Sequence, residues 1–254
     1  MPVTIFHTAD LHNRLRPAAA RQLAELKRQH PGSLLLDAGD AIAAGNLTYR
    51  MMGEPVLRVM ANAGYDAMAM GNRESHPLRH ALERKLRDAS FPVLAANIRA
   101  QRRPLPEVIR AYVILSTPAG RVAVIGLAPQ ITRPSSLWAR VTDYVFDDPM
   151  EVAPELARRL RAEADLVVCL SHCGEKIDRE LAAVPEVDLV LGGHVHRDRI
   201  VSEQGRALIV YPGHHGSHVA RTEVMLGHGR GKPLPNGSGR GDARSELIAL
   251  ERGR

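Results

Sequence analysis

Cysteine, aromatic residues and lysine are scarce in this chain of 254 residues. It has two cysteines, 4% aromatic side chains and four lysines against 30 arginines. Two cysteines cannot form a disulfide framework, so the fold must rest on an apolar core, for which 44% hydrophobic residues suffice. Few aromatics leave few platforms on which single-stranded nucleic acid could stack. The scattered arginines and net charge of +6 therefore indicate a general arginine bias that attracts small anionic phosphates, and nucleic acid is not expected as the main substrate.

Long apolar runs are also absent. No segment approaches the roughly 20 apolar residues of a membrane span. The first strand-like run, residues 3–7, leads directly to Asp10 without the pattern of a signal peptide. These features predict a cytoplasmic enzyme with no membrane partner. Cys169 is expected to be a buried thiol, whereas Cys173 is either a neighbour of a functional histidine or a small residue in a tight loop.

Short apolar strands alternate with amphipathic helices along the chain. The expected strands are residues 3–7, 33–37, 66–70, 92–95, 109–115, 121–127, 165–170, 187–191, 199–202, 207–211 and 218–226. The expected helices are residues 17–29, 54–63, 77–89, 150–163 and 175–183, with Pro17, Pro55 and Pro77 in their first turns. Residues 109–127 read as a hairpin that turns at 117–120. The pattern predicts an α/β protein with mixed sheets flanked by helices.

The end of the chain has a different composition. Residues 227–243 are rich in glycine and proline and too poor in apolar residues to pack, which indicates a linker. Ser245 is a candidate cap for a short helix through Glu251, but one or two turns are marginal alone, so an unstructured end is expected. We therefore predict a catalytic domain at residues 1–226 and a linker with a short tail at residues 227–254.

Five polar fragments each follow an apolar, strand-like run. They are Asp10-Leu11-His12, Gly39-Asp40, Gly71-Asn72-Arg73-Glu74, Ser171-His172 and Gly193-His194-Val195-His196. Each fragment alone is a weak signal, but five loops at strand ends can converge on one crevice of an α/β sheet. The glycines in these fragments let the backbone approach a metal or a phosphate closely.

The polar fragments contain a mixture of carboxylate, amide and imidazole ligands. The candidate metal ligands are Asp10, His12, Asp40, Asn72, His172, His194 and His196. This mixture suits two divalent ions, manganese first, with iron, zinc or cobalt as alternatives. Two such ions neutralise a phosphoryl group and produce hydroxide near neutral pH, which is what phosphoester hydrolysis requires.

The chain resembles the calcineurin-like metallophosphoesterases, and within them the N-terminal catalytic domain of bacterial 5′-nucleotidases and UDP-sugar hydrolases. The resemblance covers roughly residues 3–226 and includes, beyond the five fragments, the segments 7–12, 35–40, 64–72, 91–98, 122–127 and 187–194. It implies a four-layer α/β/β/α sandwich. It also implies that Asp10, His12 and His196 hold one metal, that Asn72, His172 and His194 hold the other, and that Asp40 bridges them.

Position 73 departs from the pattern of that family. A histidine that assists the leaving group follows the asparagine in the family, whereas this chain has Arg73. Arginine stays protonated and cannot donate a proton, and general acid help is worth roughly 10²–10⁴-fold. Arg73 is therefore interpreted as a phosphate clamp that, together with Asn72, binds substrate and favours diesters or activated monoesters.

Further histidines are candidates for the missing acid or for substrate contacts. His76 follows Arg73 closely and is a candidate catalytic acid, although an exposed histidine near a helix start is the plainer reading. His214 and His215 lie on a loop that can face the metals, and they are candidate substrate-binding residues.

Three functions remain open from the sequence. The first is a phosphodiesterase that acts on a small nucleotide-like substrate. The second is a 5′-nucleotidase-type monoesterase that uses His76 or metal-bound water as its acid, and the third is a metal-bearing protein that binds a phosphorylated ligand with little catalysis. By the resemblance, the relatives carry a C-terminal domain that grips the nucleoside, so a partner chain, an oligomer contact or arginine-rich loops would supply specificity here.

Overall fold

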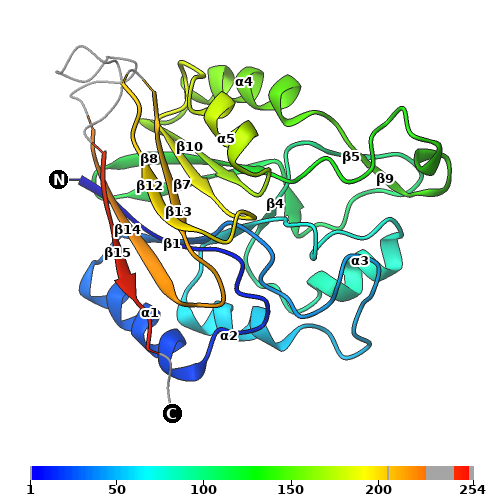
Figure 1. The fold of residues 1–254 in the computed structure, drawn as a ribbon, viewed down its shortest axis with the longest axis horizontal. Helices are drawn as coiled ribbons and strands as arrows, with labels where there is room; N and C mark the ends of the chain where they lie inside the picture. Colours follow the sequence, from blue (N-terminus) through cyan, green and yellow to red (C-terminus); the bar gives the residue numbers. More distant parts are fainter. Residues whose placement is uncertain (1, 205, 227–242, 252–254) are drawn as a thin grey trace.

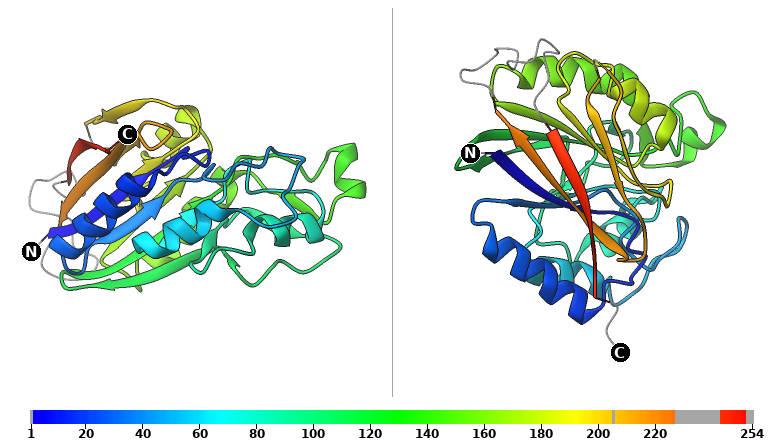
Figure 2. Two further views of the ribbon diagram at one scale, coloured as in Figure 1. Left: turned by 90° about the horizontal axis from the view of Figure 1, so that it is seen from below. Right: turned by 60° about the vertical axis from the view of Figure 1, so that its left-hand side comes forward.

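Two β-sheets packed face to face form the centre of the computed structural model, which describes residues 2–204, 206–226 and 243–251. Helices cover both outer faces, so the molecule has four layers in the order α/β/β/α (Figure 1). The views in Figure 2 show the same layers from two further sides. This arrangement confirms the fold class that the sequence predicted.

The larger sheet has seven strands in the order β15-β14-β1-β2-β3-β4-β6. These strands are β1 (Pro2–Thr8), β2 (Leu34–Asp37), β3 (Ala67–Ala69), β4 (Val93–Leu94), β6 (Ile109–Arg110), β14 (His218–Met225) and β15 (Ala243–Ala249). Its outer face is covered by α1 (Pro17–Gln29), α2 (Pro55–Ala63) and α3 (Arg79–Leu86). Within this sheet β1, β2, β3, β4 and β6 are parallel to one another. The strand β14 is antiparallel to β1, and β15 is antiparallel to β14.

The second sheet has six strands in the order β12-β13-β11-β10-β8-β7. They are β7 (Tyr112–Thr117), β8 (Gly120–Leu127), β10 (Leu166–Ser171), β11 (Leu189–Gly192), β12 (Asp198–Val201) and β13 (Leu208–Pro212). The helices α4 (Pro149–Leu160) and α5 (Glu175–Leu181) cover its outer face. A separate antiparallel pair joins β5 (Ile98–Ala100) to β9 (Tyr144–Phe146), and a 3₁₀ helix, η1 (Leu137–Val141), precedes β9.

The central strands are buried on both faces, which explains their continuous apolar sequences. In β10, Leu166, Val168 and Leu170 face the core between the two sheets. The alternate residues Val167 and Cys169 pack under α4 and α5. The predicted burial of the Cys169 thiol is confirmed. Because alternate side chains point to opposite faces of a strand, apolar side chains pack both between the sheets and under the helices. This packing on both faces holds the ends of the strands in place.

Two of the three prolines that were predicted in the first turn of a helix are found there. Pro17 and Pro55 occupy first-turn positions of α1 and α2, as predicted. Pro77 does not, because α3 begins only at Arg79, whose N–H donates to Asp143 Oδ2 at 2.8 Å. The side chain of Asp143, distant in sequence, thus accepts the N–H of the first helical residue.

The segment expected as one strand at 109–115 divides between the two sheets. Ile109–Arg110 is β6 of the larger sheet, and Tyr112–Thr117 is β7 of the smaller one. The predicted hairpin is confirmed, since β7 and β8 pair antiparallel with Thr117 opposite Gly120.

The chain end forms a strand, so the helical or unstructured end expected from Ser245 to Glu251 is wrong. Ala243–Ala249 pairs antiparallel with β14 along its length, from Val224 opposite Ala243 to His218 opposite Ala249. Leu247 packs into the core between the sheets, and the backbone partners of β14 outweigh the marginal helix signal. The larger sheet thus extends past the domain boundary predicted at residue 226, whose position stays a prediction, and residues 227–242 of the expected linker lie outside the described residues.

None of the helices in the described ranges combines the length and the apolar character that a membrane crossing requires.

Candidate metal centre

The loops that follow β1, β2, β3, β10 and β11 meet at one end of the two sheets. His172, after β10, reaches across to the larger sheet, where its Nδ1 lies 2.6 Å from the carbonyl oxygen of Ala38. The N–H of His194, after β11, donates to Asp10 Oδ2 at 2.8 Å. The N–H of Asp10 in turn donates to Gly39 O at 2.9 Å. These contacts bring loops from both sheets into one site, as the sequence predicted for strand ends.

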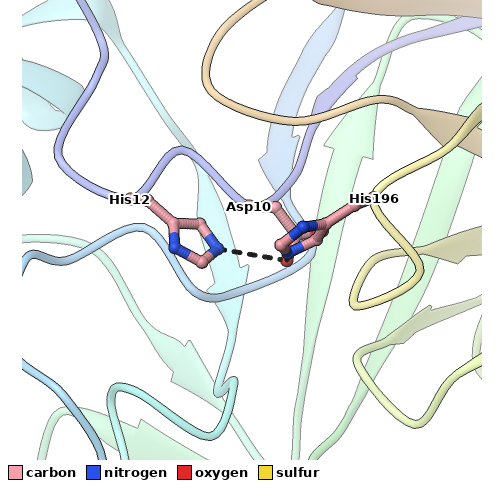
Figure 3. A group of neighbouring side chains, drawn as sticks. All are labelled: Asp10, His12 and His196. Carbon is pink, nitrogen blue, oxygen red and sulfur yellow. Dashed lines mark ion pairs between the residues drawn. The ribbon is translucent and has the colours of Figure 1, made fainter.

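Asp10, His12 and His196 form one group of potential metal ligands. Asp10 Oδ1 lies 3.5 Å from His12 Nε2 and 3.2 Å from His196 Nε2. The two imidazoles approach the carboxylate from separate loops (Figure 3). The group has the size and chemistry of a divalent-metal site with nitrogen and oxygen ligands.

Asp10, Asp40 and His172 form a second group that shares Asp10 with the first. His172 Nε2 lies 3.5 Å from Asp40 Oδ1 and 3.9 Å from Asp10 Oδ1. Asp40 Oδ2 also lies 3.9 Å from His12 Nε2, so both carboxylates stand between the two groups. Five predicted ligands are therefore brought together, and Asp10 approaches both groups as closely as Asp40, to which the resemblance gave the bridging role.

Asn72 and His194 lie beside the two groups. The amide Nδ2 of Asn72 donates to Asn46 Oδ1 at 3.0 Å, which leaves Asn72 Oδ1 buried with no hydrogen-bond partner. The ring of His194 stands edge-on to that of His172 with centroids 5.0 Å apart. Burial lowers the pKa of His194, and the neighbouring His172 lowers it further, which keeps the ring neutral and able to ligate.

Buried atoms without a hydrogen-bond partner test whether this site fits a cation. Such atoms are rare in proteins, because burying an unpaired polar group is costly. Four of the nine in the described part of the chain belong to predicted ligands, namely Asp10 Oδ1, His12 Nε2, Asn72 Oδ1 and His172 Nε2. The carboxylate and amide oxygens carry lone pairs and no proton, so what they lack is a hydrogen-bond donor or a cation. The residues fit a metal.

The ring of His172 is oriented for ligation. A carbonyl oxygen only accepts, so Nδ1 carries the proton that is donated to Ala38 O, and Nε2 points toward the carboxylates. Burial alone would lower the pKa of His172, but attraction to the nearby carboxylates of Asp40 and Asp10 outweighs it and raises the pKa to about 9. The two carboxylates thus favour a positive charge at this position.

Several ligands have an unusual backbone conformation. Positive φ angles occur at Asp10 (52°), His12 (47°), Asp40 (55°), His194 (72°) and His196 (53°). A left-handed backbone costs of order 1–3 kcal/mol at a non-glycine residue, and it persists only where surrounding contacts impose it. The concentration of these angles here is typical of a functional site.

Glycines let the ligand loops approach one another. A Cβ built on Gly71 would lie 2.3 Å from Asp40 Oδ1 and 2.5 Å from the Asp40 backbone nitrogen. A Cβ on Gly193 would lie 2.9 Å from His172 Nδ1. The sequence analysis predicted that these glycines let the backbone approach a metal or a phosphate closely. In the structure they let one ligand loop pack against another.

Substitution of Gly71 by alanine is expected to push the Asp40 loop aside. We expect Gly71→Ala to destabilise the protein by about 2–3 kcal/mol, as overpacking does, and to weaken metal binding as well. Urea denaturation and metal analysis after dialysis measure the two effects. Gly45→Ala is the control, because its new Cβ would meet only Thr48 Oγ1 at an ordinary 3.4 Å. Equal losses of stability and of bound metal in Gly71→Ala and Gly45→Ala would contradict this role of Gly71.

Glu74 fixes two of the ligand loops, a role the sequence analysis did not assign. Its buried carboxylate accepts four backbone hydrogen bonds. Oε2 accepts from the N–H groups of Asp40 and Gly71, both at 2.9 Å, and Oε1 from those of Ala41 and Ile42 at 2.9 and 3.2 Å. The signal available in the sequence was an acidic residue inside an otherwise ligand-bearing fragment.

Lys85 is a second residue that the sequence analysis missed. Its side chain is fully buried, and Nζ donates to the carbonyl oxygens of Gly45, Asn46, Arg73 and Ser75 at 2.5–3.2 Å. Burial lowers its pKa to about 8. A lysine on a helix usually faces solvent, so nothing in the sequence indicated that it ties the Arg73 loop to the loop after β2.

Arg73 lies at the edge of the metal centre. Its backbone N–H donates to Asp40 Oδ1 at 2.8 Å, its Nη1 donates to Ala43 O at 3.2 Å, and its Nε lies 3.8 Å from Asp40 Oδ2. The side chain as a whole is 31% exposed, so it is partly open to solvent. This position is compatible with the phosphate clamp that the sequence suggested.

The remaining candidate histidines occupy two different places. His214 stacks on His196 with centroids 5.0 Å apart, and His215 stands edge-on to His12 at 5.3 Å. Together with Arg14 they line a basic pocket of about 310 Å³. His76 belongs to neither group of potential ligands, and its Nδ1 accepts a hydrogen bond from the Leu78 N–H at 3.1 Å. Its role as an acid stays a prediction.

Comparison with known proteins agrees with this geometry. The sequence model of the calcineurin-like phosphoesterases matches residues 3–198. The chain belongs to this family. The resemblance found in the sequence is thereby confirmed.

Curated relatives of this phosphoesterase are nucleotide hydrolases by name. The trifunctional nucleotide phosphoesterase protein YfkN of Bacillus subtilis (strain 168) is 26% identical over 88% of the chain. The 5′-nucleotidase of Rattus norvegicus is 30% identical over 76% of the chain. The chain spans only 18% and 38% of the lengths of these relatives.

Among solved structures, the 5′-nucleotidase precursor of Thermus thermophilus has the same fold. It aligns with 98% of the chain at a TM-score of 0.79 and 24% identity, and the chain covers 55% of it. At that identity the match supports the fold alone.

Proposed function

We propose that this chain is a dinuclear metal-dependent phosphodiesterase that acts on a small nucleotide-like substrate. The observation that carries the proposal is the set of unpaired buried ligand atoms on Asp10, His12, Asn72 and His172, gathered around two carboxylates. Two divalent ions, manganese foremost, would neutralise the phosphoryl charge and acidify a water molecule. The names of the relatives support a nucleotide as the substrate.

Each residue then has a definite task. Asp10, His12 and His196 would hold one ion, Asn72, His172 and His194 would hold the other, and Asp40 would be available to both. Glu74 and Lys85 act indirectly, since they fix the backbone of the ligand loops.

Arg73 decides which esters react. Its fixed positive charge binds a phosphoryl oxygen and stabilises developing negative charge, but it has no proton to donate. His214 and His215 lie against His196 and His12 and complete the contacts to the substrate. A leaving group that departs without protonation is therefore favoured, and an alkoxide leaving a monoester is not.

Ester preference tests the proposal directly. We expect the manganese-loaded protein to hydrolyse a nitrophenyl phosphodiester with a higher kcat/KM than the matching monoester. For a monoester with an alkoxide leaving group, such as a nucleoside 5′-monophosphate, Arg73→His is expected to raise turnover by about tenfold or more, because it restores a proton donor beside Asp40. His76→Ala is the control and should leave the diester rate unchanged.

The alternatives predict other outcomes. A 5′-nucleotidase-type monoesterase would prefer the monoester and lose that activity in His76→Ala. A phospholigand-binding protein would hold two metals and cleave neither ester. Either result would replace the proposal.

A further inference from the structure

An apolar pocket of about 370 Å³ lies beside the metal centre, and none of the roles assigned so far involves it. One wall is Leu47, from the loop after β2, and His76 lies near it in the loop before α3. The other walls are Ile131, Trp138 and Tyr144, from the segment between β8 and β9. The volume falls in the range of pockets for small organic ligands.

The pocket shares two residues with the surroundings of the proposed ligand Asn72. Asn46, which lines the pocket, accepts the hydrogen bond from Asn72 Nδ2 at 3.0 Å. Ser75, which also lines it, donates through Oγ to the backbone oxygen of Asn72 at 2.8 Å. A phosphoryl group at the metal centre would therefore have this pocket next to it, on the side of Arg73.

Trp138 stands at the pocket with an unusually open side chain. It is the only tryptophan of the chain, and 75% of its surface is exposed. Leu47, which also lines the pocket, is equally exposed at 75%. A large aromatic residue exposed next to an apolar pocket is characteristic of a surface that is covered by a ligand.

The position of Trp138 is fixed by its surroundings. Ser136 Oγ caps the 3₁₀ helix η1 by accepting from the Ala139 N–H at 3.3 Å, and Gln101 Nε2 donates to Ala139 O at 2.6 Å. The small β5–β9 pair follows directly and holds this segment as it projects from the body of the molecule (Figure 2, left). The indole is thus presented on a braced support and not on a free loop.

Polar groups around the pocket already have partners. Tyr144 Oη donates to Pro104 O at 3.1 Å, Thr142 Oγ1 donates to Tyr144 O at 2.9 Å, and His76 Nδ1 accepts from the Leu78 N–H. These three groups are not free to read the edge of a ligand, and most of the remaining lining is apolar. The pocket therefore suits a flat ring that is held by its faces.

We propose that this pocket binds the base of a nucleotide substrate, stacked on Trp138, while the phosphoryl group lies at the metal centre. This inference rests on the proposed function, because it assumes a phosphoester at the metals. The recognition is by ring stacking, so discrimination between bases is weak.

Tryptophan fluorescence tests binding without any need for catalysis. Excited selectively at its tryptophan, the metal-free protein reports on Trp138 alone. We expect adenosine to change the emission saturably, ribose to leave it unchanged, and guanosine and cytidine to bind within about tenfold of adenosine. Absence of a saturable change with every nucleoside would overturn the proposal, even if the protein hydrolyses esters.

Variants then connect the pocket to the substrate. We expect Trp138→Ala to raise KM for a nucleotide ester by about tenfold with kcat unchanged, and Trp138→Phe to restore KM to within about threefold. KM for an alkyl ester without a ring should not change. Leu137→Ala is the matched control, because Leu137 is 77% exposed on the same 3₁₀ helix but does not line the pocket. An equal rise in KM for both esters, or the same effect in Leu137→Ala, would overturn the role of Trp138.

The two proposals fail separately. If neither ester is cleaved while adenosine still changes the fluorescence of the wild type and of Leu137→Ala, the pocket stands and the proposed hydrolysis is wrong. If both esters are cleaved with the same KM in wild type and Trp138→Ala, the hydrolysis stands and the base pocket is wrong.

Discussion

Asp10→Asn should empty the metal centre and reduce hydrolysis by about a thousandfold or more, since several kcal/mol of Lewis-acid stabilisation are lost. Asp10 is the residue on which both groups of potential ligands depend. Its Oδ1 is buried without a hydrogen-bond partner and lies within 3.9 Å of His12, His172 and His196. An asparagine keeps the shape of the side chain but removes the charge that attracts the cations. Metal analysis after dialysis should give fewer ions per chain than the wild type.

In the metal-free protein, the same substitution should not lower the melting temperature. An amide nitrogen in place of Oδ1 can donate to a neighbouring imidazole, and the remaining oxygen can still accept from the His194 N–H. Asp10→Asn is therefore expected to melt at or above the temperature of the wild type in chelator, and to gain less when metal is added. Asp88→Asn is the control, because it also alters a buried unpaired carboxylate oxygen but belongs to neither group. An Asp10→Asn protein that retains the wild-type metal content would refute the assignment.

Glu74→Gln should be the most destabilising of the near-isosteric changes. Each carboxylate oxygen accepts two backbone N–H groups, so the amide NH₂ of glutamine would face two donors and leave both unpaired. At 1–3 kcal/mol for each unsatisfied buried group, the expected loss is about 3–4 kcal/mol. In a chain of this size that corresponds to a decrease in Tm of roughly 10 °C. Metal affinity should fall as well, because the loops of Asp40 and Asn72 lose their common support.

Glu54→Gln separates this effect from the general cost of changing a buried glutamate. Glu54 is also fully buried, but its oxygens accept one N–H each, from Ala43 and Ala44. One donor instead of two would be left unpaired, so about half the loss of stability is expected, with metal affinity maintained. A Glu54→Gln variant that loses metal as readily as Glu74→Gln would show that the effect is not specific to the ligand loops.

Most of the fold could be predicted because the strands are buried on both faces and flanked by helices with clear periodicity. The ligand loops could also be predicted from the sequence, because each polar fragment directly follows an apolar run that ends at the same edge of a sheet. Asp10, His12, Asp40, His172 and His196 are brought together for that reason.

The parts that escaped prediction depend on partners distant in sequence. The strand β15 forms because β14 offers it a free edge, and Ser245 pairs with Thr222 instead of capping a helix. Lys85 is buried because four carbonyl oxygens from two loops surround it. The Trp138 pocket requires the β5–β9 pair, whose strands have only three residues each and carry little pattern of their own.

The left-handed backbone at five ligand positions has a consequence for how this protein can evolve. The left-handed ligands and four of the nine buried unpaired atoms lie at one end of the sheets, while the core of the described structure is filled with well-packed apolar side chains. Glycine at Asp10 or Asp40 would relieve the left-handed strain, but it would abolish the site and leave the N–H of His194 or of Arg73 without its acceptor. Backbone strain at these positions therefore comes with the same side chains that would hold the cations, and cation binding would offset it.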